Sequence, residues 1–315
     1  MIARIEKLLE YETAGDPMTR LKWKRKTLRN IAKELGSFGI QVTAHTVGRL
    51  LRDMDYSLRA NRKAIAASSA PDRNEQMLHI AKIRKRFTRA GKPVVSVDSK
   101  KKELVGQFKN PGVAWSESPR LVNDHDFRST AKGMALPYGI YDPTTNHGSV
   151  FIGTSHDTPE FAVESISRWW HEEGRRRYPA ARQLLILADG GGSNGSTCRL
   201  WKERIQAEIC DRYGISVTVS HYPTGASKWN PIEHRLFSEI SKNWAGRPLD
   251  SYHTILNYIR TTRTVKGLAV RACLVRKKYD IGIKVTDEQM KQLRIVPATN
   301  LPRWNYTISP RKNVN

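Results

Sequence analysis

Apolar residues recur at helical spacing in two stretches near the start of the chain. Both stretches lie within residues 27–54, and a turn that contains Gly36 and Gly39 separates them. Because Thr43 can cap the second stretch, we expect two short amphipathic helices. A helix-turn-helix has this pattern, and its second helix would offer four side chains to a DNA groove: His45, Thr46, Arg49 and Arg52. A plain helical hairpin with a solvated basic face fits the pattern equally well.

After a polar stretch at 61–73 that predicts a linker, helical periodicity alternates with short apolar runs. Helices are expected at residues 73–89, 159–173, 197–213 and from 230 onward. Strands are expected at residues 94–98, 104–108, 136–141, 149–153, 184–189 and 215–219. Strands first, followed by alternating helices and strands, predict an α/β fold in which helices flank one mixed sheet. This is the order of the ribonuclease-H-like fold, here preceded by a basic helix-turn-helix module.

The chain is strongly basic, and the charge narrows the functions to consider. Its 315 residues include 54 Lys and Arg against 30 Asp and Glu, which gives a formal net charge of +24 and a sequence pI of about 10.1. Residues 1–92 carry 21 of the basic and 9 of the acidic side chains. Such a field favours polyanionic partners, so we expect the front of the chain to dock on nucleic acid.

Cysteine usage and hydropathy exclude further classes. The spacing of the three cysteines argues against a disulfide framework and against a zinc site; they are Cys198, Cys210 and Cys273. No apolar run approaches the roughly 20 residues of a membrane helix, and the N-terminus does not read as a signal peptide. We therefore expect a soluble cytoplasmic protein without a membrane partner.

Two strand-terminal carboxylates and one helical carboxylate form the candidate site. Asp98 and Asp189 each end an expected strand, and neighbouring strand ends converge at one edge of an open sheet. Glu233 falls in the first turn of the helix that Asn230 and Pro231 open. Hard cations such as Mg²⁺ prefer oxygen ligands, and paired metals stabilise both oxygens of a phosphodiester under attack. The three acidic residues are therefore candidate catalytic residues and metal ligands.

Each candidate also has a structural interpretation. Asp98 fits a strand-terminal turn, and Glu233, three residues after Asn230, fits a capping box. The glycine-rich loop at 190–195 has room for a phosphate, but it matches neither the P-loop nor the dinucleotide fingerprint.

Three further polar residues flank the last acidic position. Lys228 fits a contact to a DNA phosphate or base, and it fits a solvated loop lysine as well. His221 and His234 are candidates to orient water or phosphate, with a structural role as the alternative.

Long motifs then carry a resemblance to a known family. In order along the chain they are VVSVDSKKKELVGQFKNPG, VNDHDF, LPYGIYD, TPEFAVESISRWW, RYPAARQLLILADGGGSNG, SKWNPIEHRLFS, GIKVTDEQ and WNYTISPR. With these motifs, residues 16–311 resemble the Rhodopirellula-type DDE transposases of ISAzo-type bacterial insertion sequences. The resemblance implies that the three acidic residues of the family align on Asp98, Asp189 and Glu233. It also implies cutting at transposon ends, followed by attack of the freed 3′-hydroxyl on target DNA.

The expected organisation has four parts: a helix-turn-helix module at 1–62, a basic linker and helix at 63–93, a catalytic domain at 94–250 and a C-terminal extension at 251–315. The expected function is that of an insertion-sequence DDE transposase with Mg²⁺, or Mn²⁺, as cofactor. Its expected partners are double-stranded DNA, as transposon ends and target, and further copies of the chain in a homo-oligomeric DNA complex. Since family members carry a longer N-terminal stretch, a truncated copy that acts only as a DNA-binding regulator is one alternative. A ribonuclease-H-like nuclease acting on RNA hybrids or branched DNA is another.

Overall fold

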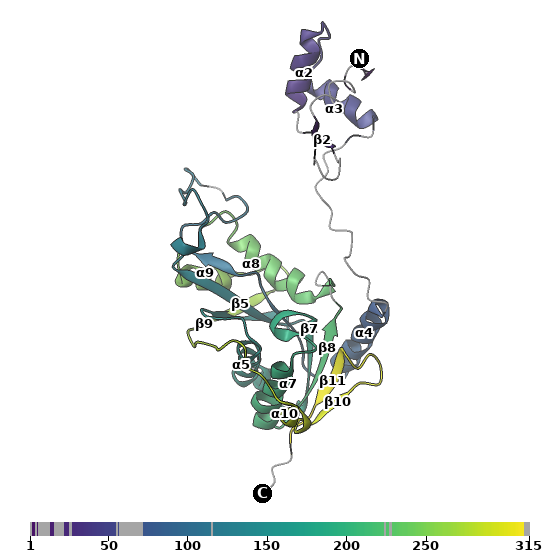
Figure 1. The fold of residues 1–315 in the computed structure, drawn as a ribbon, viewed down its shortest axis with the longest axis vertical. Helices are drawn as coiled ribbons and strands as arrows, with labels where there is room; N and C mark the ends of the chain where they lie inside the picture. The colour runs from purple at the N-terminus through teal and green to yellow at the C-terminus, as the bar shows by residue number, and fades with distance from the viewer. Residues whose placement is uncertain are drawn as a thin grey trace. The chain divides into compact units, whose positions relative to one another are not determined.

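The computed structural model describes residues 2–3, 5, 13–15, 22–24, 27–54, 56, 72–114, 116–223, 225–226 and 229–311. The chain divides into two compact units, residues 1–66 and 67–315, and each is described by itself (Figure 1). No helix in these described ranges is long and apolar enough to cross a membrane.

The first unit holds the pair of short helices that the periodicity predicts. Its elements are α2 (Leu28–Ser37), α3 (Ala44–Asp53) and the antiparallel strands β1 (Thr13–Gly15) and β2 (Lys22–Lys24). Each helix begins at a threonine cap, because the hydroxyl of Thr27 accepts from the N–H of Asn30 and that of Thr43 from the N–H of Thr46. The helices bury a small apolar core made of Ile5, Ile31, Leu35 and Val47.

The second unit is built on a nine-stranded sheet. Its strands are β3 (Val94–Ser99), β4 (Glu103–Val105), β5 (Gly133–Asp142), β6 (His147–Gly153), β7 (Gln183–Asp189), β8 (Ser216–Tyr222), β9 (Ala269–Val275), β10 (Ile295–Pro297) and β11 (Asn305–Ile308). Their order is β10-β11-β8-β7-β3-β5-β6-β9, with β4 paired to β5. The meander β3-β5-β6 is antiparallel, whereas β7 and β8 run parallel to β3. This mixed sheet confirms the expected ribonuclease-H-like fold for the second unit, whereas the helix-turn-helix in the first unit stays a prediction.

Helices cover both faces of the sheet (Figure 1). The helices of the unit are α4 (Arg73–Arg89), α5 (Pro159–Trp169), α6 (Arg175–Arg177), α7 (Arg199–Ile205), α8 (Ser238–Asn243), α9 (Tyr252–Thr261) and α10 (Asp287–Lys291), with the π-helical turns η2 (Trp170–Gly174), η4 (Gln206–Asp211) and η6 (Glu233–Phe237) and the 3-10 turns η1 (Arg128–Thr130) and η3 (Gly192–Asn194). Because side chains alternate along β3, Val95 and Val97 pack with α5 and α7, while Val94 packs with α4 on the opposite face. The segment from η6 to α9 covers β5, β6 and β9.

The sheet draws on residues well outside the range 94–250. β9 pairs with β6 and β11 pairs with β8. From α4, the buried Gln76 exchanges two side-chain hydrogen bonds of 2.9 and 2.7 Å with the buried Asn305 of β11. Helix α4, which precedes the candidate catalytic residues, and strand β11 are thus parts of one packed unit. The four-part functional division stays a prediction.

Three expected elements differ in detail from the structure. The strand expected at 104–108 ends at Val105, because the N–H of Gly106 turns away to the carbonyl oxygen of Leu249, 2.9 Å distant. The helices expected at 159–173 and 197–213 are present, and both continue into π-helical turns.

Candidate active site

Asp98 and Asp189 stand at equal register on neighbouring strands. β3 and β7 are parallel, and Val97 lies opposite Ala188, so the next residue of each strand is one of the two aspartates. Residues at equal register share a face of the sheet, and adjacent strands lie about 4.8 Å apart. The parallel pairing therefore places two carboxylates side by side at the carboxyl edge of the sheet.

Glu233 reaches the same face through the helical turn that it opens. Gly139 of β5 is the register partner of Asp98. A Cβ at Gly139 would lie 2.5 Å from Cε1 of Phe237 and 2.9 Å from Cδ1 of Ile232, so η6 rests directly on this strand. Only a residue without a side chain permits so close an approach. The helix of the third carboxylate is thus packed against the neighbour of the first.

Burial and mutual repulsion act on these carboxylates. Burial, followed by the negative charges of Asp189 and Glu233, raises the pKa of Asp98 to about 7. Burial also raises the pKa of Glu233, with the positive charge of Lys100 opposing the rise and Asp189 adding to it. Since the negative charge of Asp189 raises the pKa of both Asp98 and Glu233, the three residues form one electrostatic cluster.

Backbone N–H groups orient both aspartates. The N–H of Ser99 donates to Oδ1 of Asp98 at 2.8 Å, and the N–H of Gly190 donates to Oδ1 of Asp189 at 2.7 Å. Each carboxylate is therefore held by the residue that follows it.

Asn230 connects Asp98 to the helix of Glu233. Its fully buried side chain donates from Nδ2 to Oδ2 of Asp98 at 3.5 Å and accepts on Oδ1 from the hydroxyl of Ser96. Its backbone carbonyl accepts from the N–H of Glu233 at 3.2 Å. Within this described segment no side-chain hydrogen bond joins Asn230 to Glu233, so the capping box considered for Glu233 is not formed.

The three carboxylates are ligands of the type that a hard divalent cation prefers, although their side chains do not form a complete coordination site. Among the described residues, no group of three or more His, Cys, Asp or Glu side chains is arranged to hold a metal ion. Carboxylate oxygens are nevertheless the donors that Mg²⁺ and Mn²⁺ prefer. Asp98, Asp189 and Glu233 would be the residues to hold such a cation, and its positive charge would relieve the repulsion among them.

Comparison with protein families decides the class of this site. The family described as "Rhodopirellula transposase DDE domain" matches residues 4–310. The chain belongs to this family. It is therefore an insertion-sequence transposase, an enzyme that cuts DNA and transfers the cut strand, and its class uses divalent metal ions.

Solved structures of the Mos1 transposase are similar to this chain at low identity. The Mos1 paired-end complex with left transposon end has a TM-score of 0.47 and 14% identity, covering 82% of this chain and 69% of that one. The Mos1 mariner paired-end complex with Mn has a TM-score of 0.46 and 14% identity, covering 82% and 70%. The complex with Mg has a TM-score of 0.45 and 13% identity, covering 82% and 69%. A likeness at this level transfers neither a site nor an activity. No curated protein matches the chain significantly.

The transposase has a fourth acidic residue near the cluster that the sequence analysis missed. Asp157 accepts from the hydroxyl of Ser99 at 3.1 Å, and its charge adds to the rise in the pKa of Asp98. It directly precedes Thr158, the cap of α5. Because polar residues are common just before a helix cap, no sequence pattern distinguishes this aspartate.

His221 supports Asp189 from inside the sheet and does not reach solvent. Its Nδ1 lies 3.2 Å from the carbonyl oxygen of Asp189, and its Nε2 lies 3.1 Å from the hydroxyl of Tyr306. Since the indole of Trp201 donates to that hydroxyl at 2.9 Å, the tyrosine proton points to Nε2 and Nδ1–H donates to Asp189. Burial lowers the pKa of His221 to about 4, so the imidazole is neutral. His221 is therefore a structural residue, whereas His234 is exposed.

The residues predicted to contact DNA lie elsewhere in the chain. α3 exposes three of them: His45, Arg49 and Arg52. Thr46 is partly buried and donates its N–H to the cap residue Thr43 at 3.1 Å. Lys228 lies outside the described residues. DNA contact by any of these five residues stays a prediction.

The glycine-rich loop after Asp189 folds into a compact turn. Gly192 has a φ of +63°, and Asn194 is buried with its Oδ1 accepting from the hydroxyl of Tyr138 at 2.9 Å. Phosphate binding by this loop also stays a prediction.

Proposed function

We propose that Asp98, Asp189 and Glu233 hold the divalent cations with which the transposase cuts transposon-end DNA and joins it to target DNA. All three ligands are hard carboxylate oxygens, which select Mg²⁺ and allow Mn²⁺ to replace it. The observation that carries the proposal is the equal register of the two aspartates on parallel strands, beside the helix of Glu233.

Neighbouring backbone groups fix the orientation of the two aspartate ligands. When bound, divalent cations supply positive charge that stabilises the attacking and leaving oxygens of a phosphodiester. Ser99 and Gly190 each fix one carboxylate oxygen of the aspartate before them, at 2.8 and 2.7 Å. Because a carboxylate offers about four lone-pair sites, Asp98 and Asp189 keep ligand capacity despite these hydrogen bonds.

Cutting and joining have the same bond chemistry in this proposal. Water attacks a phosphodiester at the transposon end, the bond from phosphorus to the 3′-oxygen breaks, and a 3′-hydroxyl is released. That hydroxyl attacks a phosphodiester of the target, forms the new phosphorus–oxygen bond and expels the 3′-oxygen of the target strand. One set of carboxylates serves both steps.

We assign the positioning of double-stranded DNA to the basic front of the chain and to Lys228. The proposed contacts are His45, Thr46, Arg49 and Arg52 of α3 together with Lys228. In functional terms, residues 1–62 dock DNA, 63–93 form the linker and helix, 94–250 catalyse, and 251–315 extend the catalytic part. The net charge of +24 supports a polyanionic partner.

Copies of the transposase are proposed to act together. A transposon has two ends, and each must be cut before both are joined to one target. Two ends held at once require two active sites, so the working form is a homo-oligomer assembled on DNA.

The experiment compares cutting with binding in variants that keep side-chain shape. Asp98→Asn, Asp189→Asn and Glu233→Gln each remove one ligand charge, and each should nearly abolish Mg²⁺-dependent cutting of duplex DNA that flanks the gene. DNA binding measured in a chelator should persist in all three. Asp124→Asn, at an exposed carboxylate, is the control and should keep its activity.

Two other outcomes separate the alternatives. Binding without any metal-dependent cutting by the unchanged chain would support a DNA-binding regulator. Preferential cutting of RNA–DNA hybrids would support a ribonuclease-H-like nuclease. The clustering of the three carboxylates favours an enzyme over a regulator, and the family match over residues 4–310 favours the transposase over the nuclease.

A further inference from the structure

A pocket rich in lysine lies directly after the strand that carries Asp98. β3 ends at Ser99, and the chain passes through three consecutive lysines before β4 begins at Glu103. The pocket has a volume of about 340 Å³, and its lining includes Lys101, Lys102, Phe108, Lys109, Asn110 and Asp126. Lys101 of its lining follows Asp98 by three residues, which span at most about 10 Å of extended chain.

The surroundings of this pocket are held in place by the protein itself. Nζ of Lys100 lies 2.9 Å from Oε1 of Glu103 and 4.6 Å from the ring centre of Trp244. Nδ2 of Asn110 donates to the carbonyl oxygen of Trp244 at 2.8 Å. Both sides of the pocket are thus tied to the end of α8, so the pocket is formed before any ligand arrives.

The side chains that line the pocket carry more positive than negative charge. Lys101, Lys102 and Lys109 are exposed, and none has an ion-pair partner in the described part of the chain. Of the two carboxylates in the lining, that of Glu103 is bound by Lys100, whereas Asp126 is exposed. Three ammonium groups consequently face one unengaged carboxylate.

We infer that this lysine pocket binds a phosphodiester group of the DNA strand close to the bond that is cut. The inference rests on the proposed function, which brings the DNA backbone to the edge where Asp98 stands. Lysine binds phosphate as a point charge on a flexible stem, without the fixed orientation of a guanidinium fork. Such a site grips the backbone irrespective of sequence, which suits a target that varies.

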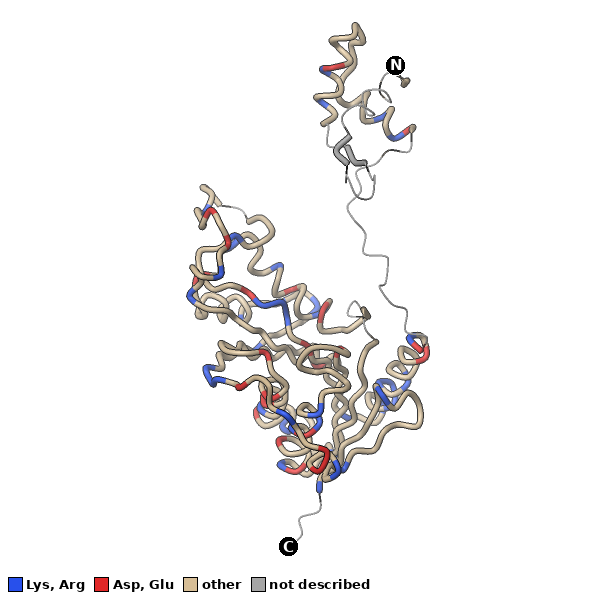
Figure 2. The backbone as a smooth tube through the Cα atoms, viewed as in Figure 1, with Lys and Arg blue, Asp and Glu red and all other residues tan. Residues whose placement is uncertain are grey.

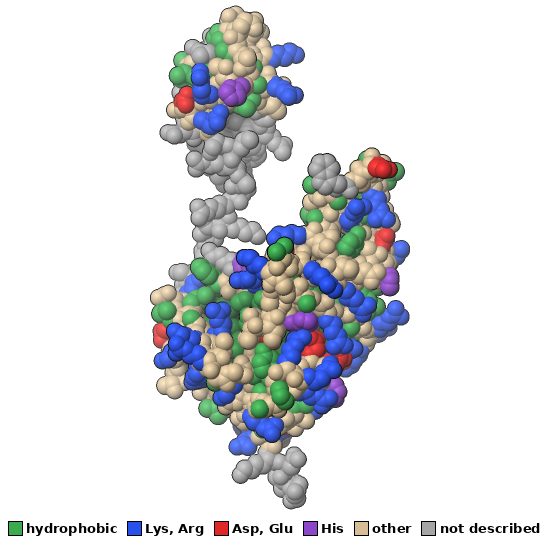
Figure 3. All heavy atoms as spheres, turned by 180° about the vertical axis from the view of Figure 1, so that it is seen from behind, with side chains coloured by type: hydrophobic (Ala, Val, Ile, Leu, Met, Phe, Trp, Pro, Cys, Tyr) green, Lys and Arg blue, Asp and Glu red, His purple; other side chains and the backbone are tan. Residues whose placement is uncertain are grey.

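Basic charge alone would not locate this site. Lys and Arg are spread over the second unit, both along its backbone and over the surface seen from behind (Figures 2 and 3). Two features distinguish the pocket: its concave shape and its position three residues beyond Asp98.

The first experiment measures how DNA binding by the full chain depends on salt. The variant Lys101→Gln/Lys102→Gln/Lys109→Gln is compared with Lys266→Gln/Lys284→Gln/Lys291→Gln, which removes three exposed lysines outside both the pocket and the basic front of the chain. The probe is a fluorescein-labelled duplex of the DNA flanking the gene, in EDTA so that no cutting occurs. The pocket variant should reduce the slope of log affinity against log salt by at least about 0.9, the value for one lost phosphate contact. Equal slopes for the two variants would overturn the inference.

A second variant removes a negative charge from the same pocket, so the expected change in DNA affinity is in the opposite direction. Asp126→Asn removes the unengaged carboxylate from the lining, so it should tighten duplex binding. Asp124→Asn, two residues away and absent from the lining, should leave affinity unchanged. Because these changes preserve volume at exposed positions, they remain informative if the triple variant unfolds. Unchanged affinity in Asp126→Asn would contradict the inference.

Further measurements separate this inference from its rivals. If AMP bound and the triple variant abolished that binding while the duplex slope stayed unchanged, the pocket would serve a free nucleotide and the inference would fail. If the chain cut DNA in Mg²⁺ but the pocket variant bound like its control, the inference would fail and the proposed function would stand. If the slope fell but the unchanged chain never cut DNA, the proposed function would fail and the pocket would remain a DNA site.

Discussion

The side-chain amide nitrogen of Asn230 lies 3.5 Å from Oδ2 of Asp98, while the amide oxygen accepts from Ser96 two residues earlier on the same strand. The backbone carbonyl of Asn230 also accepts from the N–H of Glu233 at 3.2 Å. One buried side chain thus ties the first carboxylate to the helix of the third.

Asn230→Ala should impair cutting through ligand position. Without the amide, Asp98 keeps the hydrogen bond from the N–H of Ser99 but loses its contact at Oδ2, and the buried hydroxyl of Ser96 loses its partner. We expect kcat to fall by on the order of 10²-fold, the cost of a small misplacement in an active site. The Mg²⁺ concentration for half-maximal cutting should rise as well, which a purely structural loss would not cause.

Asn243→Ala is the control for Asn230→Ala, because it makes the same substitution at an exposed asparagine outside the carboxylate cluster. Asn243 ends α8, and its side-chain amide donates to the carbonyl oxygen of Tyr258 at 2.7 Å. Its loss should cost about 1 kcal/mol of stability, as for a typical hydrogen bond, and leave the Mg²⁺ dependence unchanged. The same Mg²⁺ dependence in both variants would show that Asn230 does not position Asp98.

Gly139→Ala should push the helix of Glu233 away from the sheet. The added Cβ would meet Phe237 at 2.5 Å, so we expect a loss of roughly 1–3 kcal/mol in unfolding free energy, as for an overpacked core. The rate of DNA cutting should fall by more than the loss of unfolding free energy accounts for. Trimming the obstacle in Gly139→Ala/Phe237→Leu should restore part of both, as measured by thermal unfolding and cleavage assays. Unimpaired cutting in Gly139→Ala would mean that the position of Glu233 does not depend on this contact.

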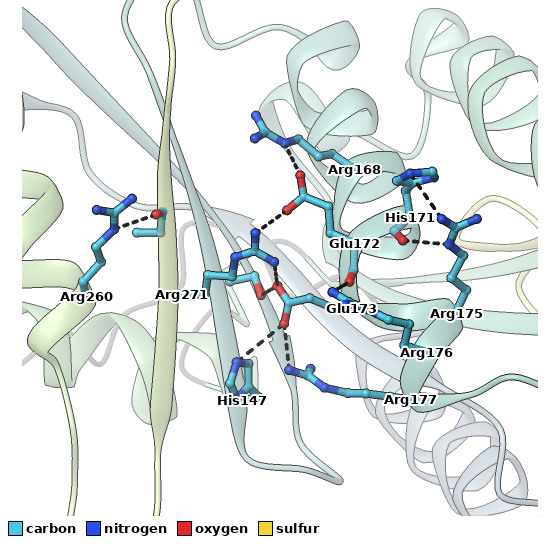
Figure 4. Close-up of polar contacts among 12 residues, drawn as sticks. His147, Arg168, His171, Glu172, Glu173, Arg175, Arg176, Arg177, Arg260 and Arg271 are labelled. Atoms are coloured by element: carbon cyan, nitrogen blue, oxygen red, sulfur yellow. Dashed lines mark hydrogen bonds and ion pairs between the residues drawn. The ribbon is translucent and has the colours of Figure 1, made fainter.

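Glu173 anchors the helical segment after α5 to the edge of the sheet (Figure 4). It is buried, accepts from the hydroxyl of Ser149 at 2.7 Å and pairs with Arg177 at 2.7 Å. Breaking a buried pair leaves a charge without its partner, so Glu173→Gln should cost about 3 kcal/mol in chemical denaturation. Glu172→Gln, at a more exposed neighbour that pairs with Arg168 at 2.7 Å, should cost under about 1 kcal/mol. Equal losses in the two variants would refute a special role for Glu173.

His147 in the same network predicts a pH dependence of stability. Burial, followed by the positive charge of Arg177, lowers the pKa of His147 below its ordinary value of 6.5, while Glu173 opposes the shift. The other charged groups facing it are Asp142 and Arg271. The unfolded chain then binds a proton that the folded chain does not, so this contribution to stability is present above pH 6.5 and is lost as pH falls below it. In urea titrations, the free energy of unfolding should fall less steeply towards acid pH in His147→Asn than in the unchanged chain. Identical pH profiles would contradict the prediction.

The sequence predicted the strands of Asp98 and Asp189 because each is a continuous apolar run that ends on a carboxylate. It also predicted the helix of Glu233 from Asn230 and Pro231. The role of Asn230 was beyond its reach, because the same residue is an ordinary helix cap and its true partner, Ser96, lies on a distant strand.

The contribution of the C-terminal residues to the sheet was not predicted either. Strand β9 is half-exposed and contains the charged Arg271, so its sequence does not read as a buried strand. Strand β11 has only four residues, which are too few to show a hydrophobic periodicity. Their place depends on tertiary partners: β9 lies along β6, and Tyr306 of β11 bonds with buried His221. Such pairings carry no local signal.

The most direct test of the metal-holding carboxylates is the metal preference of Asp98→Cys in a cleavage assay on transposon-end DNA. A thiolate is a softer ligand that Mg²⁺ accepts poorly and Mn²⁺ tolerates better. The account predicts that the unchanged chain cuts with either ion, whereas Asp98→Cys is inactive in Mg²⁺ and regains cutting in Mn²⁺. The same change at Asp124, an exposed carboxylate outside the cluster, should leave cutting in Mg²⁺ intact. An Asp98→Cys protein that folds and cuts normally in Mg²⁺ would contradict the claim that Asp98 holds the metal.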